Sequence, residues 1–128
     1  MKEQLYNYYG LTAIDAVKLF KKSMCCKDSW IKAIHEITIS KSAQEKGCPK
    51  NTFLGLCEEG LVKGIPKGNY TESIKNKDYA LEAIKILKAS PNKSFTPKEL
   101  WSKLKLGDKR HNSQMDVILG LWNEGLII

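Results

Sequence analysis

The sequence predicts an all-α protein, mainly helical with short β segments possible, that consists of two similar halves. The string FLGLCEEGLV at residues 53–62 recurs as ILGLWNEGLI at residues 118–127, a shift of 65 positions. Earlier in each half, AIDAVKLFK at residues 13–21 matches ALEAIKILK at residues 80–88, a shift of 67. Apolar residues in these segments recur with helical spacing. Two matches in the same order indicate a tandem duplication of one helical unit.

The duplication divides the chain into a first half, residues 1–69, and a second half, residues 70–128. The shift of about 65 residues sets the size of each unit, which is near the lower limit for a domain that is stable alone. We therefore expect the two halves to pack against each other in one body.

Three helices are predicted in the first half. Thr12 is the expected N-cap of the first helix, and Gly60 is the expected left-handed residue that ends the third. The segment after Gly60, LVKGIPKGNYT, contains apolar residues, glycines and a proline, which favour a strand and a hairpin tip. The predicted helices run from about residue 12 to 24, from near residue 28, and from about residue 49 to 59.

The second half repeats this plan with a shorter end. Ser113 is the expected cap of its third helix, and Gly125 ends that helix. Only three residues follow Gly125, so this half lacks room for a hairpin. Its predicted helices run from about residue 77 to 89, from near residue 97, and from about residue 113 to 124.

Three helices followed by a glycine and two apolar residues are the plan of helix-turn-helix and winged-helix domains. LGLCEEGLV and LGLWNEGLI resemble the end of the third helix and the first wing strand of that superfamily. Each half is therefore expected to be winged-helix-like, with the second half lacking a full wing. GCPKNTFLGLCEEGLVKGIPKGNYT and HNSQMDVILGLWNEGLI also resemble a family of small uncharacterised bacterial proteins. That resemblance implies no activity.

The charge of the chain favours an anionic partner. The formal net charge is +7, from 21 basic and 14 acidic residues, and both halves carry a basic excess. Such an excess suits nucleic acid, because neutralised phosphates release counterions. However, Arg110 is the only arginine. Lysine also provides simple solubility, and guanine is read chiefly by arginine.

The first turns of the two third helices carry the residues expected to contact nucleic acid. In a helix-turn-helix protein these turns face the major groove. Lysine and arginine there contact phosphates, whereas amide and hydroxyl groups bond to base edges. The alternative is that these polar residues only cap surface helices. The candidates are Lys46, Lys50, Asn51, Thr52, Lys109, Arg110, His111, Asn112 and Gln114.

Cys48 is a second kind of candidate. It lies at a predicted helix start between Lys46 and Lys50, and such surroundings lower the pKa of a thiol. Cys48 occupies the position of Ser113 in the other half, so a small capping residue alone explains it. The four cysteines show no disulfide framework and no metal-binding spacing, and no cofactor or metal is expected.

The leading function is therefore a non-catalytic nucleic-acid-binding module with duplex DNA or another anionic partner. The alternative is a protein-protein interaction or structural module without nucleic-acid binding, and the third is a cysteine-based enzyme or redox sensor. No apolar run approaches a membrane span, and the N-terminus lacks the apolar core of a signal peptide. We expect no membrane partner and a cytoplasmic location.

Overall fold

The computed structural model describes residues 7–107 and 109–128, and seven helices lie within these ranges. The predicted all-α class is confirmed, since the described residues contain helices and one isolated β-bridge but no strand. No helix among them is both long and apolar enough to cross a membrane. The helices are α1 (Tyr8–Ser23), α2 (Cys26–Ile37), α3 (Lys41–Glu45), α4 (Gly47–Glu58), α5 (Ile74–Ala89), α6 (Pro97–Lys103) and α7 (Gln114–Asn123).

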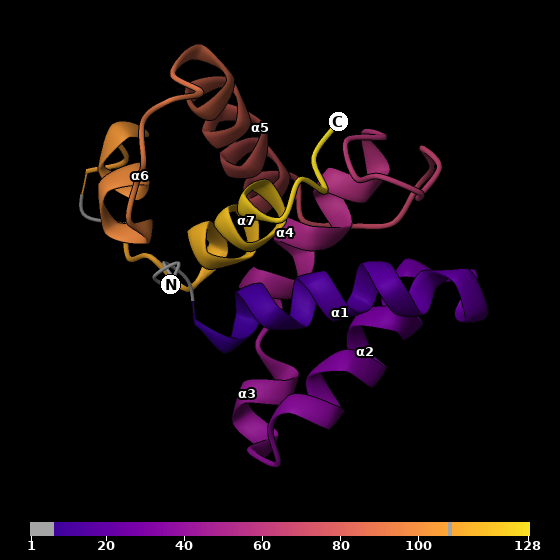
Figure 1. The fold of residues 1–128 in the computed structure, drawn as a ribbon. Coiled ribbons are helices and arrows are strands. Elements are labelled where there is room, and N and C mark those ends of the chain that lie inside the picture. The colour runs from indigo at the N-terminus through magenta and orange to yellow at the C-terminus, as the bar shows by residue number, and fades with distance from the viewer. Residues whose placement is uncertain (1–6, 108) are drawn as a thin grey trace, which may run out of the picture.

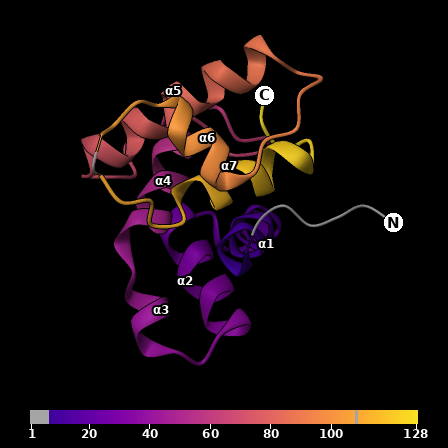
Figure 2. The same ribbon diagram turned by 90° about the vertical axis from the view of Figure 1, so that its left-hand side faces the viewer.

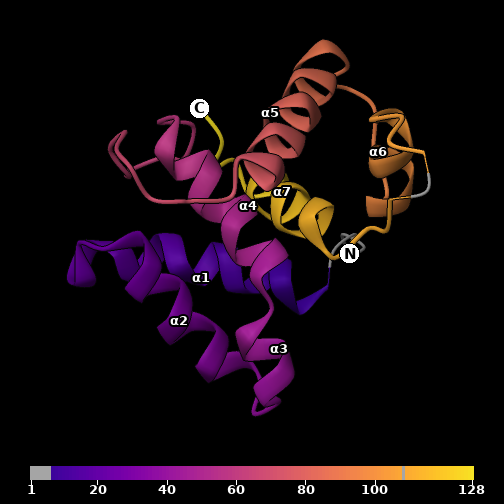
Figure 3. The same ribbon diagram turned by 180° about the vertical axis from the view of Figure 1, so that it is seen from behind.

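Helices α4 and α7 cross at the centre of the molecule, between two outer groups (Figure 1). Helices α1, α2 and α3 lie on one side of this pair, and α5 and α6 lie on the other, as the turned views also show (Figures 2 and 3). The main partner of α1 outside its own half is α7, and that of α5 is α4. The first helix of each half thus packs against the third helix of the other half.

The centre of the fold is apolar on nearly all sides of α7. Every residue from Gln114 to Leu121 is buried. Burying each large apolar side chain contributes roughly 1.5–3 kcal/mol, so this central pair supplies much of the stability. The largest fully buried side chains include Trp30, Phe53, Leu54, Leu56, Met115, Ile118, Leu119 and Leu121.

Equivalent glycines permit the two crossings. A Cβ atom added at Gly55 would lie 2.9 Å from the Cα atom of Lys77 in α5. A Cβ atom added at Gly120 would lie 2.8 Å from the carbonyl oxygen of Gly10 in α1. Gly10 and Lys77 differ by the same 67 positions that relate the first helices of the two halves. The two close contacts are therefore made by equivalent pairs.

The third helices also end alike, as predicted. Gly60 and Gly125 have φ values of +71° and +70°, the left-handed conformation that glycine adopts without a steric penalty. The next amide then bonds back to the helix: Leu61 N–H donates to the Leu56 carbonyl at 3.1 Å, and Leu126 N–H donates to the Leu121 carbonyl at 2.9 Å. These bonds satisfy carbonyls that a helix end leaves free.

The predicted start of the first helix is wrong by one turn. Helix α1 begins at Tyr8, and the Asn7 side chain accepts the N–H of Tyr9 at 2.9 Å. Thr12 lies inside the helix, where its hydroxyl donates to the Tyr8 carbonyl at 2.8 Å. Asn is at least as good an N-cap as Thr, so the helix extends until Asn7 caps it.

The cap predicted at Ser113 is also wrong. Ser113 has a φ of +67° and makes no capping bond with its side chain. The Nε2 atom of His111 instead accepts the N–H of Met115 at 2.9 Å. The sequence further gave no sign of the short helix α3, whose N-cap is Ser40, and α5 begins earlier than predicted, with Ser73 as its N-cap.

The predicted wing of the first half does not form. Val62 makes an isolated antiparallel bridge with Ile127 of the second half, and residues 63–71 contain no strand. The cause is that α4 and α7 end side by side, so the segment after α4 pairs with the segment after α7. Cys57 on α4 is fully buried, whereas Trp122 at the matching position of α7 is only half-buried.

Candidate nucleic-acid interface

A hollow of about 260 Å³ lies where α5, α6 and the loop before α7 meet the first turn of α4. We call it the basic pocket. It brings together residues that are far apart in the sequence, including four of the candidates from the second half and the candidate thiol of the first half. Its lining residues are Cys48, Lys75, Asn76, Tyr79, Trp101, Lys109, Arg110, Asn112 and Gln114.

Two aromatic rings form one wall of the basic pocket. Tyr79 on α5 and Trp101 on α6 meet edge to face, with ring centroids 5.3 Å apart and an interplanar angle of 86°. The Trp101 indole N–H donates to the Lys109 carbonyl at 3.2 Å. This bond joins α6 to the loop that carries Lys109 and Arg110. It therefore holds the two aromatic rings and these cations in a fixed relative position.

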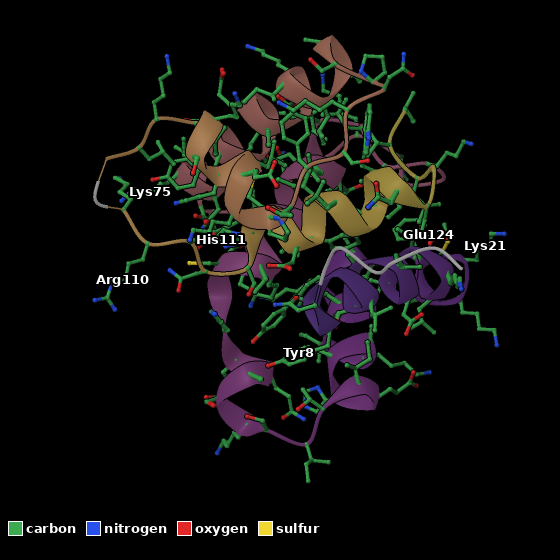
Figure 4. The ribbon with its side chains drawn as sticks, turned by 60° about the vertical axis from the view of Figure 1, so that its left-hand side comes forward. Tyr8, Lys21, Lys75, Arg110, His111 and Glu124 are labelled. Atoms are coloured by element: carbon green, nitrogen blue, oxygen red, sulfur yellow. The ribbon has the colours of Figure 1, made fainter. Side chains whose placement is uncertain are left out.

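The pocket is strongly basic. Lys75, Lys109 and Arg110 line it, and none of the lining residues that the structure describes carries a carboxylate. The Nζ atom of Lys109 lies 2.9 Å from the Tyr79 hydroxyl and 5.7 Å from the centre of that ring. The hydrogen bond to Tyr79 raises the pKa of Lys109. Figure 4 shows Lys75 and Arg110 on the same side of the molecule, with Arg110 pointing away from the body. Three cations, with no carboxylate among the described lining residues, favour an anionic ligand.

The side-chain amides of Asn76 and Gln114 form the floor of the basic pocket. The buried Gln114 donates from Nε2 to the Asn76 Oδ1 at 3.2 Å, and its Oε1 accepts the N–H of Asn112 at 2.6 Å. Asn76 in turn donates from Nδ2 to the Ser73 hydroxyl at 2.9 Å. These bonds connect the first turns of α5 and α7 with the loop, and they hold the floor rigid before any ligand binds.

His111 supports the pocket from behind. Its ring lies 5.2 Å from that of Trp101, and its Nε2 accepts the Met115 amide. Burial, and then the charge of Lys46, lower the pKa of His111 to about 4. The imidazole is therefore neutral at neutral pH, as its role as an acceptor requires. His111 is a positioning residue for the loop, and no step of binding needs its charge.

The other candidate residues of the first half lie at three separate places in the structure. Lys50 and Asn51 line a separate hollow beside the basic pocket. The Nζ atom of Lys46 lies 5.5 Å from the centre of the Tyr9 ring. Thr52 is buried, and its hydroxyl donates to the Cys48 carbonyl at 2.8 Å. Thr52 therefore packs inside the molecule and does not reach a ligand.

The first turn of α7 is not presented as a recognition helix would be. Met115 and Val117 are fully buried, and Asp116 accepts the backbone N–H of Asn7 at 2.9 Å. Gln114 bonds to Asn76 on the opposite side. This turn is packed between α1 and α5, whereas a recognition helix must be exposed where it reads bases. In this conformation Gln114 belongs to the pocket floor and cannot contact a base edge in a groove.

The sequence argument missed four residues of the pocket: Lys75, Asn76, Tyr79 and Trp101. On α6, Leu100 is fully buried, whereas Trp101 is only partly buried. A lysine and a tyrosine one turn apart at the start of α5 were the available signal, since this pairing is typical of surfaces that bind nucleic acid.

Thiol and metal chemistry has little support in this geometry. Cys25, Cys26, Cys48 and Cys57 are free thiols, and Cys26 and Cys57 are buried. Within the described ranges, no group of three or more histidine, cysteine or acidic residues is placed to hold a metal ion. Cys48 is half-buried in the wall of the basic pocket, where it adds a small side chain between charged neighbours.

Comparison with known proteins gives one result. No curated protein and no solved structure matches the chain. A family model matches residues 6–128, which is nearly the whole sequence. The chain therefore belongs to DUF6979, a family of unknown function.

Proposed function

We propose that this protein is a non-catalytic nucleic-acid-binding protein, and that the basic pocket holds an unpaired nucleotide of a bound strand. The observation that carries the proposal is the composition of the pocket, in which three cations and two aromatic rings meet and no described lining residue is acidic. Phosphate groups need the cations, and a base or sugar packs on aromatic rings.

The individual contacts follow from this geometry. Lys75, Lys109 and Arg110 surround the opening and supply charge to phosphate oxygens. The rings of Tyr79 and Trp101 offer apolar surface to a base. The Asn112 Nδ2 atom lies 3.5 Å from the Arg110 carbonyl, at the limit of a hydrogen bond, so it is able to turn to a base acceptor.

An unpaired strand fits better than a duplex. The first turn of α7 is packed between α1 and α5, so it does not enter a groove. A hollow of about 260 Å³ accommodates a single nucleotide rather than the width of a double helix. Stacking tolerates every base, and the chain has one arginine, so we expect weak sequence preference.

A catalytic role for Cys48 receives less support. A thiol nucleophile needs a base that takes its proton. The Nε2 atom of His111, which is the histidine of this region, is already occupied by the Met115 amide. The proposal therefore contains no reaction.

We also infer that the two halves descend from one duplicated unit, and that the second half supplies every described lining residue of the basic pocket except Cys48. Tyr9 stands at the position of Asn76, with the shift of 67 that relates α1 to α5. The Tyr9 hydroxyl donates to the Ala43 carbonyl of α3 at 3.0 Å. The same position therefore packs between helices in the first half, as Tyr9, and lines the proposed ligand site in the second half, as Asn76.

The test is a salt-titrated binding measurement by fluorescence anisotropy with a labelled single strand and the matching duplex. We expect the single strand to bind more tightly. Its log-log salt slope should be flattened by about 0.7 in Lys109→Gln, which removes one phosphate contact. Lys32→Gln on the exposed face of α2 is the charge-matched control and should leave the slope unchanged. Equal slopes in both variants would contradict the proposal and favour the interaction-module alternative.

A further inference from the structure

We propose that a second hollow, next to the basic pocket, binds the neighbouring part of the same strand, so that one strand spans two subsites. This inference rests on the proposed function. The second hollow has a volume of about 430 Å³ and lies between the start of α2, the first half of α4 and the segment before α5. Its lining residues are Lys27, Lys50, Asn51, Leu54, Tyr70, Glu72 and Ser73.

The two hollows share a wall. The first turn of α4 gives Cys48 to the basic pocket and Lys50 to the second hollow. The start of α5 gives Lys75 to the basic pocket and Ser73 to the second hollow. Cys48 lies three positions before Asn51, which lines the second hollow, so the two residues share one face of α4. The Asn76 side-chain amide of the basic pocket donates to the Ser73 hydroxyl of the second hollow at 2.9 Å. A strand that leaves the basic pocket over this wall therefore reaches the second hollow.

The chemistry of the second hollow differs from that of the basic pocket. Lys27 and Lys50 supply charge for a phosphate, and the partly buried Tyr70 supplies apolar surface for a base. Glu72 repels phosphate but accepts hydrogen bonds from an exocyclic amino group. The second subsite therefore suits a base with such a group, as in cytosine or adenine, better than thymine or uracil.

The wall that carries Tyr70 and Glu72 is fixed before binding. The Glu58 carboxylate accepts the N–H groups of Tyr70 at 2.8 Å and Thr71 at 3.2 Å, and it pairs with Lys77 at 2.7 Å. The Thr71 hydroxyl donates to the Asn51 Oδ1 at 2.8 Å, which leaves the Nδ2 of that amide as a donor. An ordered segment keeps its shape for a ligand at a low entropic cost.

The experiment measures the affinity of the full chain for oligodeoxycytidylates of about two to about twelve nucleotides. We expect the affinity to rise with length until both subsites are filled. In the double variant Lys27→Gln with Lys50→Gln, the longest strand should bind about tenfold more weakly, whereas the shortest should bind as before. The charge-matched control, Lys18→Gln with Lys32→Gln, should change neither, since both lysines lie on exposed helix faces away from the two hollows.

Base preference gives an independent readout. Wild-type protein should prefer oligodeoxycytidylate to oligothymidylate of the same length, and Glu72→Gln should reduce that preference. The two-subsite inference is overturned if the Lys27/Lys50 variant weakens short and long strands equally, or if it behaves as the control does. Those results leave the proposed function standing when Lys109→Gln still flattens the salt slope. If no oligonucleotide binds the wild-type chain, both proposals fail.

Discussion

Val62 and Ile127 occupy equivalent positions after α4 and α7, and they pair with each other in an antiparallel β-bridge. The hydrogen bonds beside this bridge are equivalent as well. Lys63 N–H donates to the Leu126 carbonyl at 2.9 Å, and Ile128 N–H donates to the Leu61 carbonyl at 2.9 Å. Leu126 lies 65 positions after Leu61, and Ile128 lies 65 positions after Lys63, so the two hydrogen bonds join the same pair of matched positions in opposite directions.

The inferred duplication predicts matched effects of substitution at two glycines. Gly55→Ala and Gly120→Ala should each destabilise the protein by about 1–3 kcal/mol, because the new methyl group meets backbone atoms at 2.9 Å and 2.8 Å. Urea denaturation measures the loss. Gly47→Ala is the control, since its nearest neighbour would be 3.6 Å away, and it should be neutral or stabilising by up to about 1 kcal/mol. Unequal losses at Gly55 and Gly120 would argue against equivalent crossings.

Glu58 should govern stability at acidic pH. Its hydrogen bond with Lys77, and then those with the Tyr70 and Thr71 amides, lower its pKa from 4.5 to about 2. A lowered pKa in the folded state means that the stabilisation is present above pH 4.5 and is lost as the pH falls towards 2. Glu58→Gln should cost about 1–2 kcal/mol at neutral pH and should remove this acid-dependent loss in urea denaturation.

Glu59 provides the matched control for Glu58. Its carboxylate lies 3.7 Å from the Lys77 Nζ atom, a looser ion pair than the 2.7 Å contact of Glu58. Glu59→Gln should cost less than about 0.5 kcal/mol, as exposed pairs do. If Glu59→Gln proved as costly as Glu58→Gln, the special role of Glu58 in holding the segment before α5 would be wrong.

His111 should make stability fall in a different pH range. Burial, and then Lys46, lower its pKa from 6.5 to about 4, so the folded state resists protonation. The stabilisation that comes from the neutral His111 ring is then fully present above pH 6.5. It decreases as the pH falls to 4, because the unfolded chain binds the proton at a higher pH than the folded chain does. Since part of the ring is exposed, we expect a loss of about 1–2 kcal/mol.

His111→Gln should remove the pH dependence in that range, and denaturation midpoints at several pH values measure it. The Glu58→Gln variant should keep this dependence, since its own range lies lower. A wild-type stability that stays constant from pH 6.5 to 4 would show that His111 does not bind the Met115 amide as a neutral ring.

Local signals in the sequence predicted the ends of α4 and α7 but misplaced several helix starts. Gly60 and Gly125 mark the ends of α4 and α7 because left-handed helix ends select glycine at a fixed place. Long-range packing could not be predicted in the same way. The two first helices carry similar apolar faces, so nothing in the pattern indicates that α1 packs on α7 and α5 on α4. Gly120 must be small because the backbone of Gly10 lies against it. The sequence does not indicate that these two glycines are in contact.

The candidate site was predicted only in part, because it too depends on long-range packing. Lys109, Arg110 and Asn112 are adjacent in the sequence and were found as a polar run. Tyr79 and Trp101 belong to other helices, and their approach depends on how α5 and α6 pack. The burial of Gln114 was missed because a polar residue at a helix start is usually exposed, whereas here it bonds across to α5.

The central claim is that nucleic acid binds in the basic pocket. The three tryptophans, Trp30, Trp101 and Trp122, give three indole signals in a ¹H–¹⁵N correlation spectrum. Trp30 is buried, Trp122 is on α7, and the Trp101 indole bonds to the Lys109 carbonyl in the pocket wall. On titration with a single-stranded oligodeoxycytidylate of about twelve nucleotides, we expect the Trp101 signal to shift and saturate while the other two stay in place. A Trp101 signal that stays fixed while the oligonucleotide binds would contradict the claim.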